Sequence, residues 1–231
     1  MEFQPEDWTA LAISLKVAVV AVIFSLPVGI AVSWLLARKE FPGKTLLNGL
    51  VHLPLILPPV VTGYLLLIAF GRKGFLGAFL DNAFGLVFSF RWTGAALAAA
   101  VMGFPLMVRA IRLSIEAVDQ RLEDAAATLG ASRLSIFFTV TLPLALPGIV
   151  TGAILAFAKA IGEFGATITF VSAIPGETET LASAIYAYTQ VPGGDAGAAR
   201  LTLLAILISF AALIASEALA RRTAKRIGSA A

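Results

Sequence analysis

Residues 124–143 read DAAATLGASRLSIFFTVTLP and form a charged, helix-prone segment between two long hydrophobic runs. The pattern of residues 118–129 predicts a short helix, because its apolar residues recur at helical spacing on one stripe. The residues of this stripe are Val118, Leu122, Ala125, Ala126 and Leu129. Gly130 follows the pattern, and glycine adopts the left-handed backbone of a helix C-terminus at little cost. The sequence therefore predicts a helix, a glycine turn and a second apolar helix over residues 134–140.

This segment leads back into a hydrophobic run at Leu142 and Pro143. An amphipathic helix in such a place can simply lie on the bilayer surface. Its apolar stripe, however, is narrow and rich in alanine, which suits close packing on another protein better than deep insertion into lipid. We therefore expect a partner protein to bind this segment.

The composition of the whole chain is that of a membrane protein. Hydrophobic residues make up 59% of the 231 residues. Charged residues make up 13%, about half the share that soluble domains carry. The lack of cysteine excludes a disulfide framework, and a single histidine argues against a structural metal centre. The N-terminus, MEFQPEDW, is acidic and lacks the basic start of a signal peptide, so we expect the first hydrophobic run to be retained.

Five hydrophobic runs are each long enough to cross a hydrocarbon core of about 30 Å. They cover residues 10–37, 46–70, 84–108, 142–173 and 201–220. We expect an all-α, polytopic bundle of five transmembrane helices, in which residues 10–220 form the membrane domain. An odd number of spans places the two termini on opposite sides of the membrane.

Basic residues predict the orientation, because cytoplasmic loops are enriched in lysine and arginine. Of the 17 basic residues, 11 fall on one side of this topology, in the loops after the first and third runs and in the tail. They are Arg38, Lys39, Lys44, Arg109, Arg112, Arg121, Arg133, Arg221, Arg222, Lys225 and Arg226. This side is predicted to be the cytoplasm, with residues 1–9 in the periplasm and residues 221–231 as a basic cytoplasmic tail. Arg72 and Lys73 are exceptions on the outer side.

Prolines interrupt several runs, and the second run contains Pro54, Pro58 and Pro59. They are consistent with kinks that aid helix packing, or with a bent wall around a pathway. Gly148 and Gly152 form a pair of small residues on the fourth run. We interpret this pair as a surface for close helix packing within the bundle.

Two opposite charges lie four residues apart in the fourth run. Lys159 and Glu163 are expected to share a helix face and neutralise each other, because an unpaired ion inside a membrane is costly. One interpretation is a buried pair that fixes the helix. The other is a pair beside a polar pathway, which presents a cation to an anionic substrate. The neighbours Gly162, Gly165 and Thr167 keep the backbone accessible, so these five residues are candidates for a translocation pathway.

The sequence does not predict an enzymatic site. Gly43, Lys44 and Thr45 look like the end of a phosphate-binding loop, but Arg38 stands where that motif requires a glycine. There is no convincing Ser/His/Asp grouping and no cluster of carboxylates. We therefore expect no nucleotide site, catalytic residue, cofactor or metal in this chain, and no nucleic-acid partner.

At residues 124–143 the chain resembles the integral-membrane subunits of ABC importers. Members of this family carry a cytoplasmic EAA motif: Glu-Ala-Ala, three residues, a glycine, nine residues and then Ile-x-Leu-Pro. The matching positions here are Asp124, Ala125, Ala126, Gly130, Val140, Leu142 and Pro143, with aspartate for glutamate and valine for isoleucine. The resemblance implies a type I importer permease in which the 118–143 segment docks in a cleft of a separate cytoplasmic ATPase.

Further stretches resemble the molybdate permeases within this family. They are HLPLILPPVVTGYLLL (52–67), FPLMVRAIR (104–112), GEFGATITFVSAIPGET (162–178) and PGGDAGAARL (192–201). The resemblance implies a bacterial inner-membrane protein that lines the pathway with a second copy of itself. Its implied partners are two ATPase subunits and a periplasmic molybdate-binding protein. A sulfate, thiosulfate or tungstate importer permease is the alternative within the family, and a self-contained secondary carrier or channel is the alternative from a different class.

Overall fold

The computed structural model describes residues 4–228, and the regular structure over this range is helical. In chain order the helices are α1 (Pro5–Arg38), α2 (Lys44–Ile56), α3 (Pro59–Phe70), α4 (Phe75–Phe84), α5 (Trp92–Glu116), α6 (Gln120–Thr128), α7 (Arg133–Ile136), a π-helix (Phe137–Thr141), α8 (Leu142–Leu144), α9 (Leu146–Ile161), α10 (Gly165–Val171), α11 (Leu181–Thr189) and α12 (Asp195–Gly228). The predicted all-α class is confirmed. The ends of the predicted terminal segments, residues 1–3 and 229–231, lie outside the described residues, as do the basic side chains of residues 221–228.

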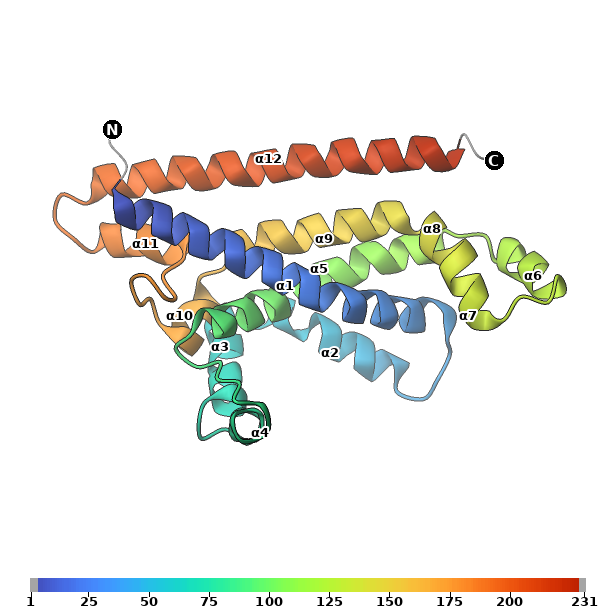
Figure 1. The fold of residues 1–231 in the computed structure, drawn as a ribbon, viewed down its shortest axis with the longest axis horizontal. Coiled ribbons are helices and arrows are strands. Elements are labelled where there is room, and N and C mark those ends of the chain that lie inside the picture. The colour runs from blue at the N-terminus through green and yellow to red at the C-terminus, as the bar shows by residue number, and fades with distance from the viewer. Residues whose placement is uncertain (1–3, 229–231) are drawn as a thin grey trace.

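The long helices α1, α5, α9 and α12 run along the long axis of the molecule (Figure 1). The N-terminus and the C-terminus lie at opposite ends of this axis. Helices α6 and α7 lie at the end where α12 finishes, whereas α10 and α11 lie nearer the end where α1 begins. The short helix α4 projects from one side of the bundle.

Among the described residues, three helices are each long and apolar enough to cross a membrane, namely α1, α5 and the Asp195–Ala215 part of α12. Two helix pairs pass the same test together, but each pair is bent at a short break. Helices α2 and α3 meet at 115°, and Arg133–Leu144 meets α9 at 68°. Counting each bent pair as one span gives the five predicted spans, so the chain is a multi-pass helical membrane protein.

The second predicted run is not one continuous helix. Pro58 disfavours helical backbone at the residue before it, and Leu57 is extended with ψ of 146°. Pro59 begins α3, at a position where a proline sacrifices no hydrogen bond. The prolines therefore produce a sharp bend between α2 and α3, which exceeds the kink that the pattern suggests.

The third and fourth predicted runs also have different bounds in the structure. Helix α5 begins at Trp92, because residues 84–91 end α4 and form a connection. Helix α9 ends at Ile161, and residues 162–164 separate it from α10. The prediction that Glu163 shares a helix face with Lys159 is therefore wrong, because Glu163 lies in the break after α9.

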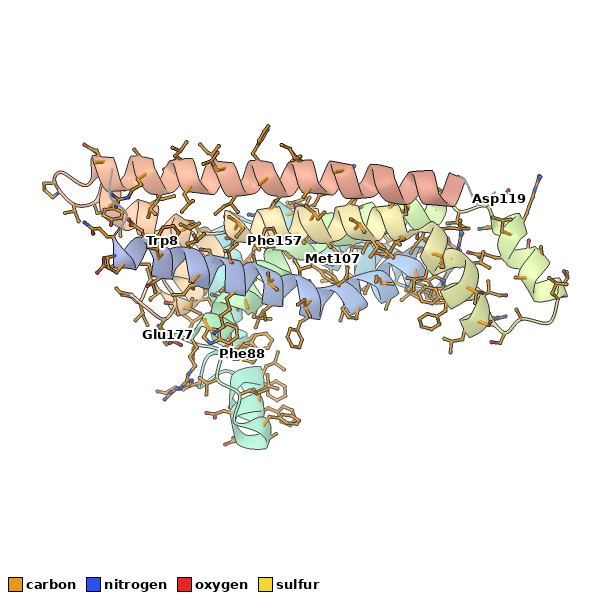
Figure 2. The ribbon with its side chains drawn as sticks, turned by 45° about the horizontal axis from the view of Figure 1, so that its top comes forward. Trp8, Phe88, Met107, Asp119, Phe157 and Glu177 are labelled. Atoms are coloured by element: carbon orange, nitrogen blue, oxygen red, sulfur yellow. The ribbon has the colours of Figure 1, made fainter. Side chains whose placement is uncertain are left out.

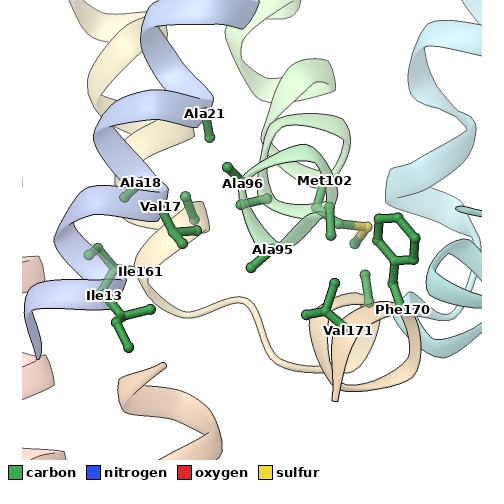
Figure 3. Packing of buried hydrophobic residues seen from close by; sticks show 14 of the residues in the cluster. Ile13, Val17, Ala18, Ala21, Ala95, Ala96, Met102, Ile161, Phe170 and Val171 are labelled. Atoms are coloured by element: carbon green, nitrogen blue, oxygen red, sulfur yellow. The ribbon is translucent and has the colours of Figure 1, made fainter. Parts of the chain in front are cut away.

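The main hydrophobic core lies where α1, α5 and α10 meet (Figure 3). Ala18 on α1 and Ala95 on α5 are fully buried, and their small side chains let the two helices approach closely. Met102 on α5 points towards Phe170 on α10, so larger side chains fill the space beside this contact. The core thus fixes α10 against helices that are distant in the sequence.

The glycine pair on α9 confirms the predicted packing within the bundle. A Cβ atom on Gly148 would clash with the side chain of Ser114 on α5. A Cβ atom on Gly152 would lie 2.9 Å from the carbonyl oxygen of Met107, also on α5. These glycines let α9 pack directly on the backbone of α5.

Candidate functional site

The segment formed by residues 118–143 contains α6, a glycine turn and the helical stretch that leads to α8. Asp119 is the N-cap of α6, and its carboxylate accepts a hydrogen bond from the backbone N–H of Arg121 at 2.9 Å. At the other end Gly130 has φ of 84°, and the N–H of Ala131 donates to the carbonyl of Ala126 at 3.1 Å. These are features of a Schellman C-terminus. The predicted helix and glycine turn are confirmed.

Helix α6 projects from the bundle and buries none of its residues; Figure 2 labels Asp119 at this end. Leu122 is 50% exposed and Leu129 is 89% exposed, whereas Val118, which precedes the helix, is buried. The predicted apolar stripe is therefore divided, because its first residue packs on this chain and its two leucines face outwards. The motif residue Asp124 is exposed as well.

A polar network connects the 118–143 segment to α1. The guanidinium of Arg38 donates to Glu123 Oε1 at 3.0 Å and to the carbonyl of Val118 at 2.9 Å. The hydroxyl of Thr141 donates to the same carboxylate oxygen at 2.8 Å. The side chain of Arg38 is only 8% exposed. The sequence pattern does not indicate this network. It gives Arg38 a role in topology and a mismatch to the phosphate-binding loop, and it gives Glu123 and Thr141 no role.

The second half of the segment is helical from Arg133 to Leu144. Ser132 caps α7 by accepting a hydrogen bond from the N–H of Ser135 at 3.2 Å. The stretch from Phe137 to Thr141 is a π-helix, which inserts a wider turn before the bundle. Leu142 is half-buried, whereas Pro143 is exposed. The structure therefore supports the predicted second helix, and places all six candidate coupling residues at least partly at the surface.

The second candidate site is the ion pair between Lys159 and Glu163. Lys159 Nζ lies 2.6 Å from Glu163 Oε2, as the predicted neutralisation requires. Glu163 Oε1 accepts a hydrogen bond from the N–H of Ala166 at 3.0 Å, close to the start of α10. The carboxylate is 1% exposed, whereas the side chain of Lys159 is 29% exposed. Glu163 therefore ties α10 to α9 and holds the ammonium of Lys159 at a partly accessible position.

The other three pathway candidates have different environments. Gly162 is exposed and borders a groove of about 460 Å³ between α9, α11 and α12. Gly165 packs on α3, because a Cβ atom there would lie 2.7 Å from Pro59 Cβ. Thr167 is buried. Of the five candidates, Gly162 is exposed, Lys159 and Gly165 are partly exposed, and Glu163 and Thr167 are buried.

At the opposite end of the molecule, Asp7 joins three elements. Its carboxylate is 1% exposed and lies 2.6 Å from the guanidinium of Arg200 on α12. The hydroxyl of Tyr188 on α11 donates to Asp7 Oδ1 at 3.1 Å. Burial, and then the hydrogen bond and charge of Asp7, raise the pKa of Tyr188. These residues hold α1, α11 and α12 together, a role that the sequence pattern did not reveal.

Comparisons with known proteins agree on one family. The family described as "Binding-protein-dependent transport system inner membrane component" matches residues 12–225. The chain is 60% identical over 222 residues to the molybdenum transport system permease protein ModB of Escherichia coli (strain K12), covering 96% of this chain and 97% of that protein. It is 36% identical over 209 residues to the sulfate transport system permease protein CysT of Salmonella typhimurium, covering 89% of this chain and 75% of that protein.

A solved structure has the same fold. It is a chain of a bacterial alginate ABC transporter, in complex with an alginate pentasaccharide-bound periplasmic protein. The TM-score is 0.74, and the match covers 95% of this chain and 80% of that one. Sequence identity is 15%, so this likeness concerns the fold alone.

Proposed function

Because the chain belongs to the family of binding-protein-dependent transport system inner membrane components, we propose that it forms the translocation pathway of an ATP-driven molybdate importer. It is the permease subunit of such an importer. The 60% identity to a molybdenum permease, against 36% to a sulfate permease, favours molybdate over the sulfate alternative. The energy for transport then comes from a separate ATPase subunit.

The observation that supports this proposal most directly is that helix α6 is exposed and is firmly attached to the bundle. A docking helix transmits motion only if it is firmly attached to the part that moves. Arg38 and Glu123 provide that attachment, and Gly130 gives α6 a sharp end. We propose that the ATPase binds here. The contact includes Asp124, Ala125, Ala126, Gly130, Leu142 and Pro143.

We place the 118–143 segment and the C-terminus in the cytoplasm, and the N-terminus in the periplasm. The location of α6 and the C-terminus at one end of the molecule supports this orientation (Figure 1). In the assembled importer, two copies of this chain line the pathway, two ATPase subunits bind below, and a periplasmic molybdate-binding protein delivers the anion from above. Closure of the ATPases moves the two α6 helices, and the spans follow as rigid bodies.

We propose that Lys159 presents its ammonium to the passing oxyanion. Glu163 fixes the ammonium through the 2.6 Å contact, while the partial exposure of Lys159 leaves it accessible to a polar pathway. Gly162, Gly165 and Thr167 belong to the same stretch and shape the backbone beside it. We assign substrate selectivity to the binding protein, because tight binding of the anion inside the permease would slow its release.

The decisive experiment is uptake by the reconstituted complex of permease, ATPase and binding protein. Molybdate, tungstate and sulfate are offered in competition, and ATP hydrolysis is measured alongside. We expect ATP-dependent uptake of molybdate that sulfate does not displace. Preferential uptake of sulfate or tungstate would reassign the substrate. Uptake by the permease alone, without ATPase, would instead support a self-contained carrier or channel.

A further inference from the structure

A cationic cavity lies in the half of the molecule away from α6, near α3 and α10 (Figure 1). It has a volume of about 370 Å³, and an adjoining cavity of about 350 Å³ shares part of its wall. Figure 2 labels Glu177, which lines the first cavity, on the side of the molecule away from Asp119. The two cavities lie among the turn after α3, the connection before α5 and the loop after α10. Their polar lining residues are Arg72, Lys73, Ser89, Arg91 and Glu177.

The charges around these cavities do not cancel. Arg72, Lys73 and Arg91 contribute three positive charges, and Glu177 contributes one negative charge, so the net charge is +2. None of the three cations forms an ion pair with a side chain that the structure describes. Arg72 and Arg91 line the first cavity together with Glu177, and Arg72 and Lys73 line the adjoining one. The excess positive charge in both cavities attracts an anion.

Ser89 provides a second and independent indication of a ligand. It lines both cavities, is 5% exposed, and its hydroxyl has no hydrogen-bond partner in the described chain. A buried hydroxyl without a partner is unfavourable, because it has lost its bonds to water. The hydroxyl oxygen is itself enclosed. Rotation of the Ser89 side chain towards the cavities would bring it to a bound oxygen that accepts its hydrogen.

We propose that Arg72, Arg91 and Ser89 form a binding site for a tetrahedral oxyanion. Guanidinium groups bind such anions through paired, charge-assisted hydrogen bonds, and Ser89 adds a neutral donor from the buried wall. Lys73 adds positive charge in the adjoining cavity. The evidence for this site comes from these side chains and is independent of the proposed import function.

Two sources can supply an anion of this chemistry. One is a free oxyanion, such as the imported one. The other is the phosphate of an anionic phospholipid, because the neighbouring helix α4 exposes Phe75, Phe79 and Phe84 and offers an apolar surface beside the cations. The experiment below distinguishes the two sources.

The test uses the full-length permease purified in detergent, and follows thermal unfolding during titration with molybdate or sulfate, with chloride at matched ionic strength. A parallel arm uses nanodiscs of phosphatidylcholine with or without phosphatidylglycerol. We expect stabilisation by one of these probes, and an affinity about tenfold weaker in Arg72→Gln and Arg91→Gln. Arg109→Gln, at the far end of α5, is the matched control and should retain the affinity. A response to neither probe, or equal losses in all three variants, would overturn the proposal.

Ser89→Ala separates anion binding from folding, because the hydroxyl that it removes makes no hydrogen bond within the described chain. Without anion, this variant should be as stable as the wild type or more stable. Its affinity for the anion should fall about three- to tenfold. An unchanged affinity would contradict the site. Unchanged anion binding in the arginine variants, with loss of binding-protein docking, would assign these arginines to a protein contact and refute the proposal.

Discussion

The carboxylate of Glu123 accepts hydrogen bonds from Arg38 on α1 and from Thr141 in the π-helix. Its side chain is 20% exposed, and that of Arg38 is 8% exposed, so this ion pair is largely removed from water. A surface ion pair contributes little to stability, but the loss of one partner from a buried pair leaves an uncompensated charge. We therefore expect Glu123 to determine how firmly α6 is attached to the bundle.

Glu123→Ala should destabilise the protein by on the order of 3 kcal/mol and reduce the coupling of ATP hydrolysis to uptake. The cost arises because Arg38 keeps its burial but loses its carboxylate. Thermal unfolding in detergent and ATPase assays of the reconstituted complex would measure both effects. Glu116→Ala is the matched control, since its pair with Arg112 is more exposed and should contribute less than about 1 kcal/mol. Equal behaviour of the two variants would contradict the role of Glu123.

The roles of Lys159 and Glu163 can be separated by a neutral pair. Lys159→Met combined with Glu163→Gln removes both charges, but keeps an oxygen that accepts the hydrogen bond from Ala166 N–H. We expect this double variant to assemble in the membrane and to lose most molybdate uptake, because the pathway has lost its cation. Lys159→Met alone should assemble poorly, since it leaves a buried carboxylate unpaired. Wild-type uptake by the double variant would show that the pair only fixes the helices.

Glu179 makes stability depend on pH. Burial, and then repulsion by Glu6, raise the pKa of Glu179 above the ordinary value of 4.5. The folded protein therefore favours the protonated acid, and stability falls as the pH rises from 4.5 through the raised pKa. Glu179→Gln should raise the thermal unfolding midpoint at neutral pH and have no effect below pH 4.5. A gain in stability that is the same at both pH values would point to packing as the cause.

At the level of elements, the sequence pattern predicts some helices far better than others. Helix α6 and its glycine turn follow from local signals, since their periodicity and the left-handed residue lie within a short stretch. The break after α9 does not follow from local signals, because the hydrophobic run continues through it. At this break the carboxylate of Glu163 accepts a hydrogen bond from the N–H of Ala166 in the first turn of α10. The contact between Arg38 and Glu123 spans 85 residues, and no local pattern contains that information. Hydropathy thus predicts the spans, whereas the polar contacts between the spans can be identified only from the three-dimensional structure.

The glycine turn after α6 offers a test of the docking element. Gly130 has φ of 84° with open space around it, so Gly130→Ala costs only backbone strain of about 1–2 kcal/mol. We expect this strain to fray the end of α6 and weaken ATPase coupling, and Gly130→Pro to abolish it. Gly43→Ala is the control, because Gly43 has φ of 91° and is equally open but lies in a different loop. If Gly43→Ala uncoupled the complex as strongly, general destabilisation would be the cause.

A change of charge on α6 tests the docking role of this helix without straining its backbone. Asp124 is exposed, so Asp124→Lys should leave folding intact and block binding of the ATPase. Co-purification of the ATPase with the permease would measure this directly. Asp81→Lys makes the same charge change at an exposed position on α4 and should leave binding unchanged. Wild-type ATPase binding by Asp124→Lys would defeat the docking proposal.

On the scale of the whole molecule, the two ends of the long axis differ in chemistry. One end carries α6 with its network around Arg38, whereas Asp7, α11 and the cationic cavities lie in the other half. If the bundle spans the membrane along this axis, the two ends face different compartments. The predicted orientation assigns α6 to the cytoplasm on the basis of flanking lysine and arginine residues.

Cysteine labelling can test this orientation, because the natural chain contains no cysteine and each introduced thiol is unique. Gln190→Cys lies after α11 and Thr128→Cys lies at the end of α6, and both positions are exposed. A membrane-impermeant maleimide should label Gln190→Cys in intact cells, and should label Thr128→Cys only after the membrane is opened. The reverse pattern would invert the topology and remove α6 from the ATPase. Labelling of both sites in intact cells would mean that these two ends do not lie on opposite sides, and the five-span arrangement would have to be abandoned.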